Sequence, residues 1–276
     1  MIKPILLYLA FLSLSCNEPP KQNAAVKSVN KSLPSPAAPA FDSSIRTIHV
    51  LVALCDNKYQ GILPVPAGIG NGQDANSNLY WGCDDGIRSY FKRSKNWTLV
   101  RRYHIDAQRL ERVVFRHNRD NVFLIADAYD GRYIKQCTID LLKSCSGQLK
   151  DTIKVEEKTL GIYGNAKLLS YIGHDGLMDF KLTDKYTNVD GKVRDVIIVA
   201  CISKKYFSPH LATTKANPLV WTTGLMCPEA YTLHDALEEY LAGGPVENIR
   251  SAAARAYARN QHCSEKAARN LLVSGY

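Results

Sequence analysis

Residues 48 to 54 read IHVLVAL, an almost uninterrupted apolar run rich in β-branched side chains. A strand covered on both faces of a parallel sheet has this composition, because helices bury its two sides. The run is therefore predicted to be the first strand of a folded body. Similar runs predict further strands at Thr98 to Arg101, Val122 to Ala126, Lys167 to Ile172, Val196 to Cys201 and Leu219 to Thr222.

Helical patterns lie between and after these strands. Asp106 is expected to cap a helix that carries Leu110, Val113, Val114 and His117 at helical spacing. Further helices are expected over Asp84 to Lys92, Ile134 to Cys145 (with Cys137 and Cys145 in the core), Tyr231 to Ala242 and Pro245 to Gln261, and in a short segment ending near Leu272. The alternation predicts an α/β fold, a three-layer sandwich around a mostly parallel sheet of about six strands.

The N-terminus has the features of an export signal. Residues 5–14 are apolar, follow Lys3 and precede Ser15-Cys16. Ten residues are too few to span a bilayer core of about 30 Å, but they suit the apolar region of a signal peptide. The small residue before Cys16 resembles the bacterial lipoprotein signal, although Ser13 stands where that signal usually has Leu. Residues 1–16 are thus predicted to end at a lipidated Cys16, with an ordinary cleaved signal as the alternative.

Composition divides the remainder into a tether and a body. Residues 17–44 are mostly Pro, Ala, Ser, Asn and Lys, so they bury too little surface to fold and are predicted to form a flexible tether. Residues 45–276 are predicted to be one domain. The whole chain is 46% hydrophobic and 22% charged, which excludes a disordered chain and a multi-span membrane protein. We therefore expect an exported, membrane-anchored lipoprotein of the bacterial cell envelope.

The basic residues are concentrated in one segment. Arg88 to Arg119 contains ten Lys or Arg against Asp106 and Glu111, in a chain whose net charge is +9. Such a segment either binds an anionic surface or is the solvated face of structural elements, and the second interpretation is favoured. Nucleic acid is not expected as a partner, because the protein is exported.

No cofactor or metal site is indicated. The eight cysteines include no C-x-x-C pair, and no H-E-x-x-H is present. The glycines at 68, 70 and 72 do not complete a dinucleotide-binding motif, because Gln73 occupies the third glycine position. Without Cys16 the body has seven cysteines, an odd number, so at least one thiol stays unpaired within a monomer.

Chemically useful residues follow three of the predicted strands. They are Cys55-Asp56-Asn57, Gly173-His174-Asp175-Gly176 and Ala200-Cys201-Ile202-Ser203. In open α/β sheets, ligands gather at the carboxyl ends of the strands, so these groups are expected on one edge. If the last two strands are neighbours, the His174 imidazole can activate the Cys201 thiol and later protonate a leaving amine.

Structural alternatives exist for each residue. A cysteine at the end of a buried strand is often only a core residue, and a histidine beside glycines often caps a turn. Cys55 is a rival nucleophile that would have to share His174. His210 and His234 are expected to be surface or helix residues.

The order of these motifs resembles the caspase-like cysteine peptidases, which include caspases, metacaspases, legumains and gingipains. The shared layout is an apolar strand ending in His plus Gly, a spacer, and an apolar strand ending in Ala-Cys. The segments VALCDNKY (52–59) and LYWGCDDGI (79–87) are similar to the first strand and first helix entry of metacaspase-like domains. The resemblance covers Ile45 to Leu241. It implies a peptidase in which Cys201 is the nucleophile and His174 is the base and acid.

The sequence also departs from that family. Asp175 stands where the family has a glycine whose amide helps to form the oxyanion hole, and Gly176 comes one residue later. Asp175 would either orient the imidazole or mark a scaffold without activity. The spacer between His174 and Cys201 is short for the family. By position in the family, Trp221 and Thr222 are candidates for the substrate-pocket wall.

These observations predict an exported, lipid-anchored cysteine peptidase or peptidase-like protein that acts on peptides or proteins through a His/Cys dyad. The main alternative is a non-catalytic caspase-like binding module that uses the basic Arg88 to Arg119 surface. A third possibility is a hydrolase that applies the same thiol to a small ester or amide.

Overall fold

The computed structural model describes residues 40–276. The predicted signal peptide, the lipidation site Cys16 and most of the predicted tether lie outside the described residues. None of the helices in residues 40–276 is long and apolar enough to cross a membrane.

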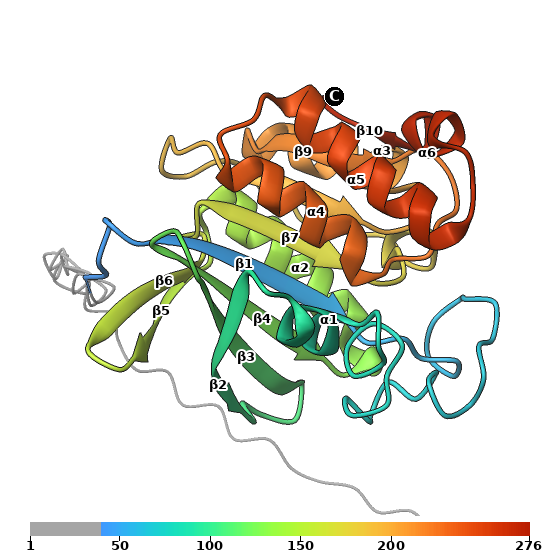
Figure 1. The fold of residues 1–276 in the computed structure, drawn as a ribbon, viewed down its shortest axis with the longest axis horizontal. Helices are drawn as coiled ribbons and strands as arrows, with labels where there is room; N and C mark the ends of the chain where they lie inside the picture. Colours follow the sequence, from blue (N-terminus) through green and yellow to red (C-terminus); the bar gives the residue numbers. More distant parts are fainter. Residues whose placement is uncertain (1–39) are drawn as a thin grey trace, which may run out of the picture. The chain divides into compact units, whose positions relative to one another are not determined.

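Eight strands form one mixed, mostly parallel sheet in the order β10-β9-β8-β7-β1-β4-β3-β2 (Figure 1). The strands are β1 (Arg46–Ala53), β2 (Trp97–Tyr103), β3 (Arg109–His117), β4 (Val122–Tyr129), β7 (Leu168–Ile172), β8 (Asp195–Val199), β9 (Asn217–Thr222) and β10 (Leu272–Val273). The five strands from β4 to β9 in this order are parallel to one another, and β2, β3 and β10 are antiparallel additions at the edges. The α/β class and the parallel centre predicted from the sequence are confirmed, with eight strands rather than about six.

Six α-helices in the described chain cover both faces of this sheet (Figure 1). They are α1 (Ile87–Arg93), α2 (Ile134–Ser146), α3 (Ser203–Leu211), α4 (Ala230–Leu241), α5 (Val246–Gln261) and α6 (Glu265–Leu271). The side chains of β1 point alternately to the two faces of the sheet, and each face has its own core. Val50 and Val52 pack in the core that includes residues of α1, α4 and α5, whereas Leu51 and Ala53 pack in the core with α2 and α3. The predicted strands and most predicted helices are thus present, and Cys137 and Cys145 are buried core residues as expected.

One predicted helix was wrong. The segment after Asp106 is the strand β3, which pairs with both β2 and β4. Asp106 does not cap a helix; its carboxylate accepts the backbone N–H groups of Gln108 and Arg109 in a turn. His117 therefore lies on a strand, not on a helix face. The helical spacing of the apolar residues was outweighed by sheet pairing, because β3 completes the unpaired side of β4.

A small hairpin was not predicted. Strands β5 (Lys150–Val155) and β6 (Lys158–Tyr163) pair with each other in a separate two-stranded sheet. Val155, Leu160 and Ile162 are buried in the core that contains α2. The hairpin covers the sheet beside β1, since Thr47 Oγ1 donates to the Gly161 carbonyl and Tyr163 N–H donates to His49 Nδ1.

A buried charge network connects β1, β3, β4 and β6. Arg112 donates through Nε and Nη2 to the two oxygens of Asp127, at 2.5 and 2.6 Å, and His49 Nε2 lies 3.1 Å from Asp127 Oδ2. Because His49 Nδ1 accepts the Tyr163 N–H, the ring is held with its proton on Nε2. Burial disfavours the Asp127 carboxylate, but Arg112 and His49 outweigh burial and lower the pKa of Asp127. Each oxygen of Asp127 and each ring nitrogen of His49 thus has a hydrogen-bond partner, and the loss of any one residue would leave a buried polar group without a partner.

We expect Asp127→Asn to destabilise the protein by about 3–5 kcal/mol, because it leaves the buried Arg112 without a counter-charge. The free energy of unfolding in urea measures this loss. As a control, Arg93→Gln removes a cation whose ion pair with Asp84 is solvent-exposed, and it should cost less than about 1 kcal/mol. Equal effects of the two substitutions would show that the network does not hold the strands together.

Candidate active site

The three groups of candidate residues follow β1, β7 and β8, which are parallel neighbours in the order β8-β7-β1. Their carboxyl ends therefore lie at the same edge of the sheet. His174 is two residues beyond Ile172, the last residue of β7, and Cys201 is two residues beyond Val199, the last residue of β8. Ile172 and Val199 are register partners. His174 and Cys201 consequently leave neighbouring strands, about 4.8 Å apart, at equivalent positions.

Gly173 fixes the start of the histidine turn. Its φ angle is +142°, and a side chain there would place Cβ 2.6 Å from the Ala53 carbonyl oxygen at the end of β1. The Gly173 N–H donates to the Val199 carbonyl at 3.3 Å, which extends the β7–β8 pairing to the residue before His174. Tyr171 adds a second restraint by donating its hydroxyl to the His174 carbonyl at 2.7 Å.

The His174 ring is oriented by Asp179. Its Nε2 lies 2.8 Å from Asp179 Oδ2, and the same oxygen accepts the Gly61 N–H at 2.9 Å. Because a carboxylate only accepts hydrogen bonds, Nε2 carries the proton and Nδ1 is left with a free lone pair. Within residues 40–276, Nδ1 has no hydrogen-bond partner and is not among the unpartnered buried atoms, so it keeps some exposed surface although the His174 side chain is only 6% exposed. The orienting role that the sequence suggested for Asp175 thus belongs to Asp179.

The Cys201 thiol is half-buried and held by the backbone of Met226. The Met226 N–H donates to Sγ at 3.3 Å, and Sγ lies 3.4 Å from the Met226 carbonyl oxygen. Burial raises the pKa of Cys201; the Met226 N–H opposes this, and the charge of Asp175 adds to it. The thiol therefore rests protonated at neutral pH and needs a base to become nucleophilic. No hydrogen bond joins Sγ to the His174 ring among the contacts of the described residues.

Cys201 lies on a sharp turn from β8 into α3. The next residue, Ile202, has φ +49° in the left-handed region, which is strained for a β-branched side chain. Its N–H donates to the Gly224 carbonyl at 2.8 Å. A nucleophile on such a strand-to-helix turn is presented away from the sheet, and strained backbone of this kind gathers at functional sites.

Thr222 fastens this turn. Its hydroxyl donates to the Ala200 carbonyl and accepts the Ser203 N–H at 3.1 Å, so it joins the residues on both sides of Cys201 and Ile202. Trp221 is also fully buried, and its Nε1 donates to the Gly275 carbonyl at 3.0 Å. Trp221 and Thr222, the candidates for the substrate-pocket wall, thus have no exposed surface in this structure. Thr222 instead supports the Cys201 turn through its hydroxyl.

Asp175 has an unusual environment. The side chain is fully buried, Oδ1 accepts the Leu177 N–H at 3.0 Å, and Oδ2 has no partner. Burial raises the pKa of Asp175 to about 7, with the nearby Asp179 charge adding to the rise and the Leu177 N–H opposing it. The backbone N–H groups of Asp175 and Gly176, the oxyanion-hole candidates, donate to no acceptor among the described residues. Both residues are buried, so the two N–H groups lack an intramolecular acceptor in the interior of the turn.

The rival residues have structural environments. Cys55 is fully buried in the core that includes α4 and α5, and burial raises the pKa of its thiol to about 11. His234 lies on α4 between Ser94 and Asp235, and His210 lies on α3 beside the Tyr186 ring. All seven cysteines of the described chain are free thiols, and Cys227 and Cys263 are exposed.

The basic segment from Arg88 to Arg119 is spread over α1, β2 and β3 rather than over two helices and a strand. Six of its ten cations form ion pairs within the described structure: Arg88, Arg93, Arg102, Arg109, Arg112 and Arg119. The carboxylates that pair with them include Glu111, which binds both Arg88 and Arg102. Much of the local charge is thus compensated in place, which agrees with the structural interpretation of this segment.

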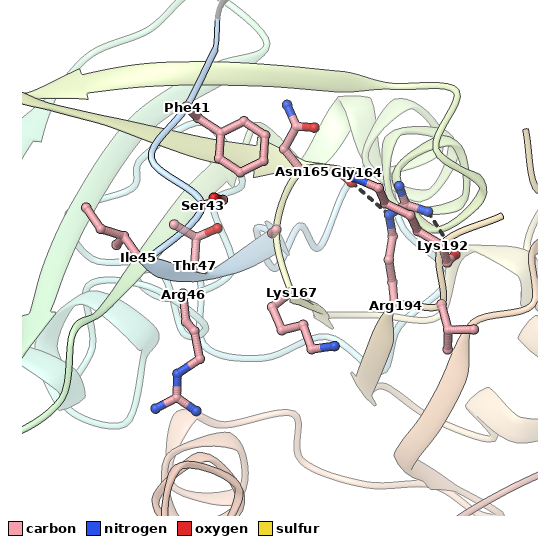
Figure 2. A pocket seen from close by; sticks show the side chains of 12 residues that line it. Phe41, Ser43, Ile45, Arg46, Thr47, Gly164, Asn165, Lys167, Lys192 and Arg194 are labelled. Carbon is pink, nitrogen blue, oxygen red and sulfur yellow. Dashed lines mark hydrogen bonds between the residues drawn. The ribbon is translucent and has the colours of Figure 1, made fainter. Parts of the chain in front are cut away.

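A cavity of about 550 Å³ lies away from these candidates, among residues at the amino-terminal ends of β1, β7 and β8 (Figure 2). It includes neither His174 nor Cys201. No group of three or more His, Cys, Asp or Glu in the described chain is arranged to hold a metal ion.

The comparisons with known proteins give no relative. No protein-family model matches the sequence, and neither the curated proteins nor the solved structures contain a significant match.

We expect Asp175→Asn to stabilise the protein, because Asn keeps an acceptor for Leu177 N–H and removes a buried charge. A carboxyl whose folded pKa is about 7, against 3.8 when unfolded, loses stability as pH rises through that interval. The gain should thus be small at pH 4 and approach about 4 kcal/mol above pH 8 as an upper bound. Urea unfolding across this range measures it, and a gain that does not grow with pH would contradict the buried-charge assignment.

We expect Thr222→Val to destabilise the protein by about 1–3 kcal/mol, because it removes a hydroxyl whose buried partners are then unsatisfied. Thr222→Ser keeps the hydroxyl and serves as the matched variant. The free energies of unfolding of the two variants, measured in urea, should differ by most of that loss. Equal values would show that the hydroxyl does not fasten the turn.

Proposed function

We propose that this chain is a caspase-like cysteine peptidase, exported and anchored to the cell envelope through a lipid on Cys16. The observation that carries the proposal is the placement of His174 and Cys201 at equivalent positions beyond neighbouring parallel strands, with the imidazole oriented by Asp179. The resemblance of the strand-end motifs to the caspase-like family supports the same assignment, and the parallel centre of the sheet is compatible with it.

In the proposed reaction, His174 Nδ1 takes the proton from Cys201 as Sγ attacks the carbonyl carbon of a peptide bond. The negative charge that develops on the carbonyl oxygen would be bound by the free N–H groups of Asp175 and Gly176. The tetrahedral intermediate collapses as His174 returns the proton to the leaving amine. A thioester to Cys201 remains, and water activated by His174 hydrolyses it to a carboxylic acid and the free thiol.

Asp179 has a positioning role in this scheme. Its hydrogen bond to Nε2 selects the tautomer that leaves Nδ1 unprotonated, and it stabilises the imidazolium that forms during attack. The contact of Asp179 with Gly61 ties the histidine to the loop that follows β1. This loop is thus part of the site, although its sequence contributes no reacting group.

Asp175 affects the same reaction through its charge. Its ionised form raises the pKa of Cys201 and thus opposes formation of the thiolate. The proposed enzyme therefore gains a larger thiolate fraction when Asp175 is protonated. Since the pKa of Asp175 is raised to about 7, the charge changes near neutral pH.

A peptide carrying a thiol-reactive acyloxymethyl ketone should label Cys201, and His174→Ala should slow this labelling by about 10²–10⁴-fold through loss of the general base. Asp179→Asn should also lower the rate, because the preferred tautomer is lost. Peptide mass mapping must locate the label, since Cys227 and Cys263 are exposed and can react.

His234→Ala is the matched control, because His234 is a hydrogen-bonded histidine on another element, and it should leave labelling unchanged. Modification of Cys201 that proceeds equally fast in wild type and His174→Ala would eliminate the dyad. Cys201→Ser must abolish the label at this position.

A further inference from the structure

The cavity at the amino-terminal ends of the strands has a lining that the proposed reaction does not use. Its walls come from the start of β1, the turn before β7 and the segment before β8. Because β1, β7 and β8 are parallel, these residues lie at the sheet edge opposite to the one that carries His174 and Cys201. Any ligand here would bind independently of the dyad.

The cavity is strongly cationic. Arg46, Lys167 and Lys192 line it, all three are exposed, and none forms an ion pair with a carboxylate of the described chain. Figure 2 shows Arg46 and Lys167 extending to the same side of β1. The twelve lining residues include no Asp or Glu. Three uncompensated positive charges around one hollow favour an anionic ligand.

The fourth cation of the lining is structural. Arg194 is buried, and its Nη2 binds Asp190 at 2.6 Å while Nε donates to the Gly164 carbonyl at 2.8 Å. Arg194 thus shapes the wall and is not available to a ligand. Asp195 follows it but binds Tyr240 and Asn217, so it does not neutralise the three free cations through an ion pair.

Apolar groups share the same walls. Phe41 and Ile45 line the cavity, and Val193 contributes a side chain that is 57% exposed. A ligand with a negative group next to an apolar part matches such a lining better than a free inorganic anion does.

The cavity lies close in sequence to the predicted lipid attachment site. The described chain begins at residue 40, and Phe41 and Ser43 already line the cavity. The predicted lipid attachment at Cys16 precedes residue 40 by 24 residues. If the sequence between them forms the flexible tether predicted above, 24 residues have a root-mean-square reach of about 27 Å, and the proposed anchor would hold this edge of the body close to the membrane surface.

We propose that the cavity lined by Arg46, Lys167 and Lys192 binds the phosphate of an anionic phospholipid in the membrane to which the chain is anchored. The cations neutralise the phosphate, and Phe41, Ile45 and Val193 contact the adjoining glycerol and acyl region. The contact orients the body so that the carboxyl ends of the strands point away from the bilayer. This proposal rests on the proposed lipid anchor at Cys16 but does not depend on catalysis by Cys201.

The test measures how strongly the full chain, carrying Cys16→Ser to exclude acylation, prefers vesicles that contain phosphatidylglycerol over vesicles of phosphatidylcholine alone. The ratio of the two partition coefficients cancels the contribution of the apolar N-terminal residues. Each membrane-facing cation contributes roughly fivefold to anionic-lipid binding, so Arg46→Gln/Lys167→Gln/Lys192→Gln should reduce the ratio by about a hundredfold. The preference should also weaken as salt is added.

The matched control is Lys92→Gln/Lys95→Gln/Arg116→Gln, which removes three exposed cations without ion pairs from the region of α1, β2 and β3. It should leave most of the preference intact. An equal loss in the control would show that net charge alone drives binding and would overturn the site. Lys192→Gln alone should lower the ratio by roughly fivefold, which keeps the test decisive if the triple variant folds poorly.

A soluble competitor separates a lipid from a free phosphate. Glycerol phosphate at millimolar concentration should displace little of the vesicle-bound protein, because it lacks the apolar part. If glycerol phosphate binds the cavity and the vesicles show no preference for phosphatidylglycerol, the lipid assignment fails. Labelling of Cys201 is measured in the same samples, so failure of this proposal and of the peptidase proposal are distinguished.

Discussion

The pairing of β7 with β8 is the constraint on which the candidate site depends. Side chains alternate between the two faces of a strand, so a shift of this register by one residue would turn His174 or Cys201 to the opposite face. The pairing continues to Gly173, whose N–H reaches the Val199 carbonyl. Gly173 is also pressed against the end of β1, and Thr222 of β9 fastens the turn after β8. Each of the two candidate residues is thus positioned by the strand next to its own.

Two groups of buried charges have opposite consequences for stability. Asp127 has partners for both oxygens in Arg112 and His49, and it joins strands that are distant in the sequence. Asp175 is equally buried, yet one of its oxygens has no partner and its pKa is raised to about 7. The fold keeps this unfavourable carboxyl beside the candidate nucleophile, together with the strained backbone of Ile202. Strained backbone and carboxyl groups with raised pKa values are common at functional sites of proteins.

The parallel sheet also separates the two edges of the body. Parallel strands place all their carboxyl ends together and all their amino ends together, so the candidate residues His174 and Cys201 on one edge and the cationic cavity on the other follow from the same topology. With both proposals, the chain enters the body beside the membrane and the reacting thiol lies at the far edge of the sheet. A substrate would then approach from the space beyond the membrane surface.

The sequence by itself determined where the buried strands lie along the chain, because continuous apolar runs have few alternatives to a covered parallel sheet. It also predicted that His174 and Cys201 follow the ends of buried strands, since strand ends can be located from those runs. Segment 109–117 was assigned incorrectly because its apolar spacing fits a helix, and only β4, with an unpaired side, makes it a strand. The β5–β6 hairpin turns at Glu156 and Glu157, which lack the glycine or asparagine that marks tight turns. The contacts of Asp179, Thr222 and Met226 were decided by tertiary structure alone, because hydrogen bonds between distant segments leave no local pattern in a sequence.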